Sequence, residues 1–93
     1  MGIQMKQYLL IFDSTFGELD RVVFEFKQID VIRDVRTCIS GSLFIKSTVS
    51  ASEIAKQLIA KYQNCRFFIT EISANRQGWL PKSLWEFIKD EQQ

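Results

Sequence analysis

An unbroken apolar run from Tyr8 to Phe12 constrains the fold of this chain more than any other feature. Successive side chains of a strand point to opposite faces of a sheet, so a continuous apolar strand carries apolar groups on both faces. The run is short, and turn-forming residues follow Asp13 directly, which favours a strand over a helix. Residues 8–12 therefore predict a central strand that is covered on both sides.

Helices and further strands can be placed by spacing. Apolar residues at steps of three and four predict a helix over about 16–28, and a capping box formed by Ser50 and Glu53 begins a second helix over 51–62. Strands are expected over 31–39, 43–47 and 65–73. In the first of these, alternation predicts that one buried face holds Val31, Val35 and Ile39.

The predicted order is strand, helix, strand, strand, helix, strand, with a hairpin turn at Ser40 and Gly41. This is the ferredoxin-like βαββαβ arrangement, an α+β fold whose four-stranded antiparallel sheet has the order 4-1-3-2. Both helices then lie on one face. The 93 residues form a single domain with its core over 6–73, and a tail over 79–90 is expected to be a short helix with Pro81 in its first turn.

Composition excludes several functions. The chain has no His, which removes the commonest general base and every zinc site or nucleophile pair that needs one. The formal net charge of +1 argues against a globally basic nucleic-acid binder. Cys38 and Cys65 form no disulfide framework, and no signal peptide or membrane-spanning segment is evident, so we expect buried or half-buried thiols in a cytoplasmic protein that does not enter a membrane.

The sheet face opposite the two helices also carries apolar residues and needs a cover. A homodimer packed sheet to sheet is one solution, since two-fold dimers are the commonest oligomers. The alternative is that the tail helix caps its own sheet and leaves a monomer. The residues expected at the dimer interface are Phe12, Phe44, Phe68, Trp79, Leu80 and Trp85.

Asp13 is the candidate catalytic and metal-binding residue, because it ends the central strand. In a two-fold dimer, two copies of this carboxylate could share a Mg²⁺ ion, which prefers oxygen ligands and can activate water without any His. The other interpretation is that Asp13 caps the turn or helix that follows it. No other cofactor is indicated, since the chain lacks a glycine-rich phosphate loop.

Basic residues on the predicted strands and the loop after them could form a phosphate-contacting patch for RNA or DNA. The alternative is solvated surface whose field is cancelled by acidic neighbours. The candidates are Arg33, Arg36, Lys46, Arg66 and Arg76.

The segments from Tyr8 to Asp13, from Ser40 to Ser47 and from Ser50 to Ile54 resemble the SinR-like branch of the CRISPR-associated Cas two superfamily. Its members are small ferredoxin-like proteins that dimerise through the sheet, and its relatives include the VapD ribonucleases and the GhoS-type antitoxin ribonuclease. The resemblance covers about residues 7–73. It implies that Asp13 matches the proposed metal-binding residue of the CRISPR subunit.

Two functions are therefore expected. The first is a homodimeric binding or scaffold protein of a toxin–antitoxin, CRISPR or phage-defence system, which engages a nucleic acid or a protein. The second is a Mg²⁺-dependent nuclease that uses paired Asp13 carboxylates. The first is favoured, because only one carboxylate occupies a plausible site and the net charge is small.

Overall fold

The computed structural model describes residues 4–73 and 75–90, and it contains four strands, three α-helices and one 3-10 turn in that part of the chain. None of the described helices has the length and apolar character needed to cross a lipid bilayer. In chain order, the elements are β1 (Lys6–Phe12), η1 (Ser14–Phe16), α1 (Leu19–Phe26), β2 (Ile32–Thr37), β3 (Ser42–Ser47), α2 (Ala51–Lys61), β4 (Phe67–Glu71) and α3 (Lys82–Asp90).

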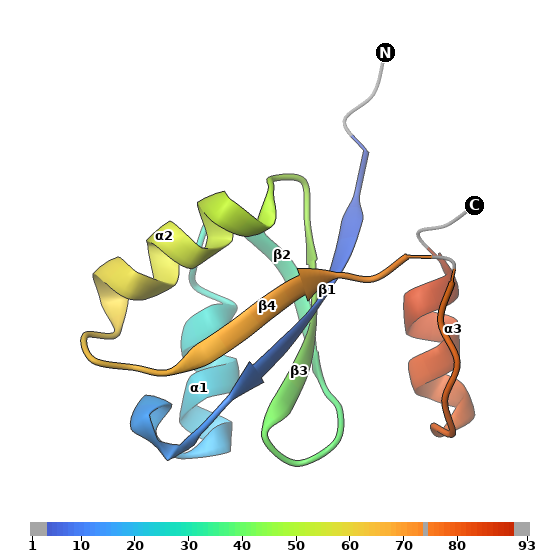
Figure 1. Cartoon of the computed structure of the whole chain (residues 1–93), viewed down its shortest axis with the longest axis horizontal. Coiled ribbons are helices and arrows are strands. Elements are labelled where there is room, and N and C mark those ends of the chain that lie inside the picture. Colours follow the sequence, from blue (N-terminus) through green and yellow to red (C-terminus); the bar gives the residue numbers. More distant parts are fainter. Residues whose placement is uncertain (1–3, 74, 91–93) are drawn as a thin grey trace.

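The strands form one antiparallel sheet in the order β2-β3-β1-β4, which confirms the predicted α+β fold and its strand order (Figure 1). The apolar strand β1 is central, as its composition predicts. It pairs with β3 on one side and with β4 on the other, so that Leu10 lies between Leu43 and Ile69.

The main core lies between the sheet and the layer formed by α1 and α2. It is built around Phe16, which is 1% exposed and lies in contact with four aromatic rings. The ring centroids of Phe12, Phe26, Tyr62 and Phe67 are 5.6, 6.1, 4.8 and 5.8 Å from that of Phe16. Edge-to-face aromatic pairs of this kind add to the apolar burial that fixes both helices on one face.

The first helix is shorter than predicted. Residues 14–16 form the 3-10 turn η1, and α1 begins only at Leu19. The cause is Gly17, whose φ of 105° and ψ of −161° cannot belong to a helix. The break lets Phe16 enter the core at an angle that a continuous helix would not give.

Strand β2 also departs from simple alternation. The register shifts between Ile32 and Asp34, which marks a β-bulge, so that Ile32 and Val35 are both buried on the helix side. The prediction that Ile39 shares this buried face is wrong, because β2 ends at Thr37 and Ile39 lies beyond it, 67% exposed. The extra residue at the bulge explains why Ile32 and Val35, three positions apart, lie on the same face.

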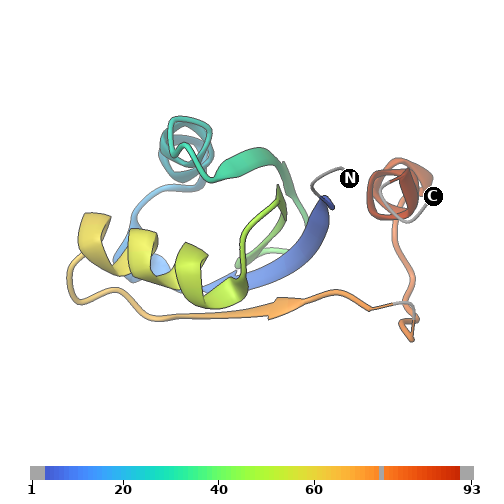
Figure 2. The ribbon, with the colours of Figure 1, turned by 90° about the horizontal axis from the view of Figure 1, so that it is seen from above.

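Helix α3 packs on the opposite face of the sheet from α1 and α2 (Figures 1 and 2). There Phe44 of β3 stacks on Phe87, with ring centroids 6.5 Å apart, and Ile88 joins them in a second, smaller core. Pro81 directly precedes the helix, and its carbonyl accepts hydrogen bonds from the N–H groups of Leu84 and Trp85. The tail thus covers its own sheet, at least in part.

Candidate functional site

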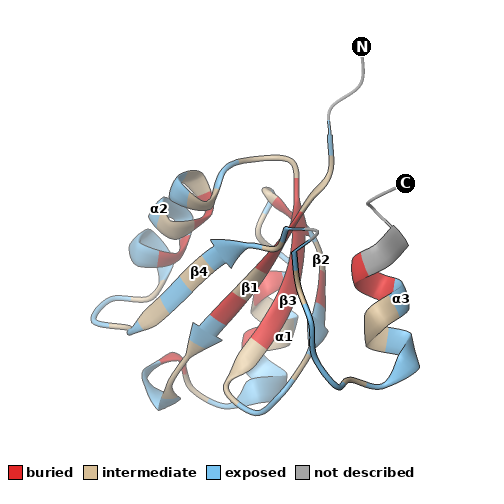
Figure 3. Cartoon of the chain, turned by 45° about the vertical axis from the view of Figure 1, so that its right-hand side comes forward, coloured by how far each residue is buried: buried red, intermediate tan, exposed pale blue. Residues whose placement is uncertain are grey.

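Burial on the α3 side of the sheet falls steadily along β1. Gln7, Leu9 and Ile11 share this face, and they are 2% exposed, half-buried and 50% exposed in turn. Figure 3 shows that β4 is also largely open to solvent. Helix α3 therefore covers one end of this face and leaves the other end open.

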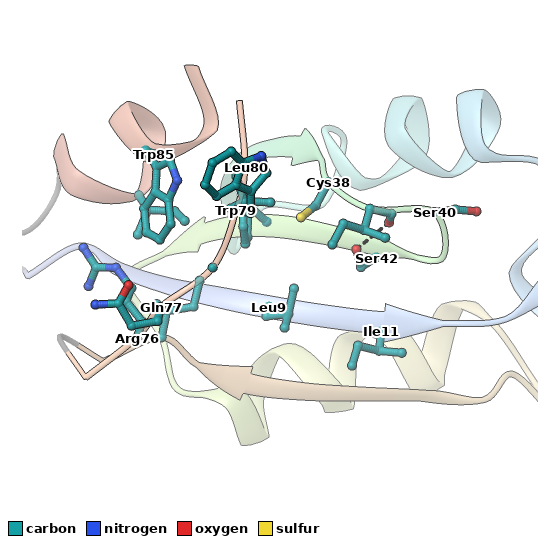
Figure 4. Close-up of a pocket in the computed structure, with 15 residues that line it drawn as sticks. Leu9, Ile11, Cys38, Ser40, Ser42, Arg76, Gln77, Trp79, Leu80 and Trp85 are labelled. Atoms are coloured by element: carbon teal, nitrogen blue, oxygen red, sulfur yellow. Dashed lines mark hydrogen bonds between the residues drawn. The ribbon is translucent and has the colours of Figure 1, made fainter. Parts of the chain in front are cut away.

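A pocket of about 490 Å³ lies where that cover ends (Figure 4). Its sheet side is formed by apolar side chains of β1, β3 and the segment after β4: Leu9, Ile11, Phe44 and Ile72. The loop before α3 and the helix itself supply the facing wall: Trp79, Leu80, Trp85 and Ile88. Three segments that are distant in sequence thus meet around one apolar space.

Polar groups lie at the two ends of the pocket. Arg76 and Gln77 lie at one end, and Ser40 and Ser42 at the other (Figure 4). Arg76 is half-buried, and its Nη1 donates a hydrogen bond to the carbonyl oxygen of Ser73 at 2.9 Å. The Nε of Arg76 is buried and has no hydrogen-bond partner. Arg76 is the one charged residue among those that the structure shows lining the pocket.

Large exposed apolar side chains border the pocket, and we call them the apolar rim: Ile11, Ile39, Phe68 and Trp79. Phe68 pairs with Ile11 across β4 and β1 and is 63% exposed. Trp79 is 99% exposed, so its indole makes almost no contact within the chain. A cluster of this kind beside an apolar pocket is typical of an interaction surface.

The structure separates the residues predicted for the dimer interface. Phe12 belongs to the helix-side core, and Phe44 is 5% exposed beneath α3, so neither lies on the open surface. Leu80 and Trp85 are half-buried in the pocket wall. Phe68 and Trp79 are exposed on the apolar rim. Phe12 is absent from this surface because it points to the other face of β1, and Phe44 is absent from it because α3 lies on its ring.

Asp13 acts as the N-cap of η1. Its Oδ1 accepts hydrogen bonds from the backbone N–H of Thr15 at 3.0 Å and from the Thr15 hydroxyl, and its Oδ2 accepts one from Nε of Arg66 at 2.6 Å. The bonds from Thr15, and then the one from Arg66, lower the pKa of Asp13 to about 2. The geometry agrees with the capping interpretation.

The Asp13 site does not fit a Mg²⁺ ion as it stands, because both carboxylate oxygens already have donors. In the described residues, no group of three or more His, Cys, Asp or Glu side chains lies close enough to hold a metal. Two copies across a symmetry axis would bring two Arg66 guanidinium groups together with the two carboxylates, which cancels the negative charge. The catalytic role of Asp13 stays a prediction, and we derive no reaction step through a metal.

The predicted basic patch is divided among separate places. Arg36 and Lys46 meet over the ring of Phe87, with their charged groups 4.9 and 4.1 Å from its centroid. Arg66 adjoins the other end of the sheet beside Asp13. Arg33 is exposed on β2, while Arg76 lines the pocket. Nucleic-acid binding by these residues stays a prediction.

Both thiols are half-buried and free, as expected. Cys38 lines the pocket together with Ile39, a residue that the sequence had assigned to the core. Gln77 and Ile11 were also missed as site residues. The two-residue period of a strand places Ile11 on the same face as Leu9 and could have indicated it, but Gln77 gave no local signal because the fold alone brings it to the sheet.

Comparison with protein-family models, with curated proteins and with solved structures found no match to this chain.

Proposed function

We propose that this chain is a non-catalytic, homodimeric binding or scaffold protein of the Cas-two-like kind, working in a toxin–antitoxin, CRISPR or phage-defence setting. The observation that carries the proposal is the apolar rim, which α3 leaves open on the second face of the sheet. Burial of such side chains stabilises association by about 25 cal/mol for each Å² of apolar surface removed from water.

The centre of the proposed contact is the cross-strand pair of Ile11 and Phe68. These two side chains stand next to each other on neighbouring strands, and they are 50% and 63% exposed. A second copy placed face to face would bury both pairs around its two-fold axis. The engaged state of Asp13 supports a binding role over a nuclease, because its carboxylate is held as a cap.

The test is the mass of the chain in solution by sedimentation velocity or light scattering, from 1 to 200 µM. The wild type is expected to have the mass of two chains. Phe68→Asp is expected to have the mass of one, because a charge in an apolar contact loses its hydration without a partner.

Phe24→Asp is the matched control. Phe24 lies on α1, on the other side of the sheet, and is 65% exposed, almost the same as Phe68. This control is expected to keep the mass of the wild type. A one-chain mass for the wild type throughout the range refutes the proposal. A dimer that Phe24→Asp dissociates and Phe68→Asp leaves intact refutes it as well, since the contact would then lie on the helices.

A further inference from the structure

We propose that the pocket between the sheet and α3 binds a small apolar monocarboxylate, with its carboxylate on Arg76 and its hydrocarbon part between Leu9 and Trp85. This goes beyond self-association, because it assigns a ligand to the pocket and a role to Arg76, although Ile11, Ile39 and Trp79 belong both to the rim and to the pocket lining.

The pocket has the size and lining of a small-molecule site. Its volume of about 490 Å³ lies within the range of about 300–1,000 Å³ that is usual for such sites. Its walls are apolar and aromatic, with polar groups only at the ends. A molecule that fills it would be mostly hydrocarbon with a polar group at one terminus.

The positive charge of Arg76 indicates that the polar group of the ligand carries a negative charge. Arg76 carries the one charge among the described lining residues, and no carboxylate lines the pocket to neutralise it. Its guanidinium is only partly used: Nη1 donates to Ser73, whereas the buried Nε has no acceptor. A buried donor without a partner is unfavourable, and a carboxylate is the acceptor that a guanidinium binds best.

The surroundings of Arg76 distinguish it from Arg66. The side chain of Arg66 is 79% exposed, and its guanidinium already pairs with the Asp13 carboxylate. Arg76 instead combines a buried Nε–H that has no acceptor with an adjacent apolar volume. Only this second combination holds both halves of an amphiphilic acid.

The experiment is a titration with octanoate followed by tryptophan fluorescence. Both tryptophans of the chain line the pocket, but Trp79 is almost fully exposed, so the emission of the half-buried Trp85 reports the filling. Octanoate is expected to bind saturably below 1 mM. Each CH₂ removed from the acid is expected to weaken binding about fourfold. The neutral probe 1-octanol, which lacks the carboxylate, is expected to bind at least about tenfold more weakly.

Arg76→Gln is expected to weaken octanoate binding at least about tenfold while leaving the affinity for 1-octanol unchanged. The matched control is Arg33→Gln, which removes an exposed arginine of β2 that does not line the pocket. It should bind both probes as the wild type does. Circular dichroism establishes that each variant is folded.

A second variant tests the location without touching the charge. A Cβ at Gly78 would lie 3.8 Å from the Trp85 ring, an ordinary contact, so Gly78→Leu projects a side chain beside the pocket wall. This variant is expected to bind neither octanoate nor 1-octanol. The proposal is overturned if octanoate does not saturate, if Arg76→Gln binds it like Arg33→Gln, or if Gly78→Leu binds like the wild type.

The titration is carried out on the wild type and on Phe68→Asp. Phe68 lies on the rim and does not line the pocket, so octanoate binding by this variant tests the pocket in a chain whose self-association is disrupted. Selective loss of octanoate binding in Arg76→Gln, with retention in Phe68→Asp, supports the ligand site whatever the mass measurement gives. Absence of binding in both chains overturns it even if the dimer forms.

Discussion

Replacing Phe87 with Ala tests whether the second core is an independent unit that holds α3 on the sheet. Phe87 is 6% exposed, stacks on Phe44, and carries Arg36 and Lys46 over its ring. The substitution removes the largest contact of α3 while leaving Ile88 in place. We expect α3 to leave the sheet far more often than in the wild type.

The size of the effect follows from these contacts. Burying a phenylalanine side chain stabilises by about 2 kcal/mol, and each of the two cations over its ring adds about 0.5 kcal/mol. The variant should therefore lose about 3 kcal/mol of docking free energy. None of the α3 residues whose burial is described belongs to the main core, so the main core keeps its own packing when α3 undocks, and the free energy of global unfolding falls by no more than the docking free energy that is lost.

Hydrogen exchange of the backbone amides measures the two effects separately. A helix of 9 residues is marginal in water by itself, so the amides of α3 exchange when it undocks. A loss of about 3 kcal/mol accelerates this exchange roughly a hundredfold. The amides of β1 and β3 exchange only when the main core opens, so they stay far better protected than those of α3. The control is Glu86→Ala, an exposed position of the same helix. Unchanged exchange in α3 of Phe87→Ala, or loss of protection in β1 to the level of α3, would refute the reasoning.

Two further predictions concern the turn after β1. Gly17→Ala should destabilise the fold by about 2 kcal/mol in urea unfolding, since a φ of 105° is strained for alanine and the new Cβ would lie against the Arg21 guanidinium. Gly78→Ala meets neither obstacle and should be near neutral. Equal losses of stability in the two variants would contradict this account. Asp13→Asn keeps a capping oxygen but loses the charge that pairs with Arg66. Because the folded pKa of Asp13 is lowered to about 2, its stabilising effect is present above the unfolded pKa of about 3.9 and is lost as the pH falls from there toward 2. Between pH 6 and pH 2.5, the urea midpoint should therefore fall less in Asp13→Asn than in the wild type. An identical fall in both chains would show that the Asp13 carboxylate does not contribute to stability.

Much of the fold could be predicted because its signals are local. The apolar run at 8–12 identified the central strand, and the capping box at Ser50 located the start of α2, whose Ser50 side chain accepts from the N–H of Glu53 at 3.2 Å. Each signal depends on residues within one or two turns of the chain, where side-chain period and hydrogen bonding act directly.

The errors arose where a single residue changes the local geometry. Gly17 ends the turn η1 and separates Phe16 from α1, although the apolar spacing of residues 16–26 fits a continuous helix. The bulge in β2 places Ile32 and Val35 on one face. A prediction from periodicity assumes uniform φ and ψ along an element, so it detects neither the break at Gly17 nor the bulge in β2.

The candidate site depends on contacts between distant segments. The sequence predicted an apolar second face and gave two ways of covering it, by the tail or by another copy. Only the tertiary structure shows that α3 covers the Gln7 end of β1 and leaves Ile11 open. It alone brings Arg76 to the pocket beside β1 and β3, and it alone engages Asp13 with Arg66, 53 positions later in the chain. Apart from the break at Gly17, the strands and helices could be predicted from the sequence, because short-range periodicity and capping control them. The tertiary structure decided which apolar and charged groups remain available, because availability depends on packing between segments that have no local relation to each other.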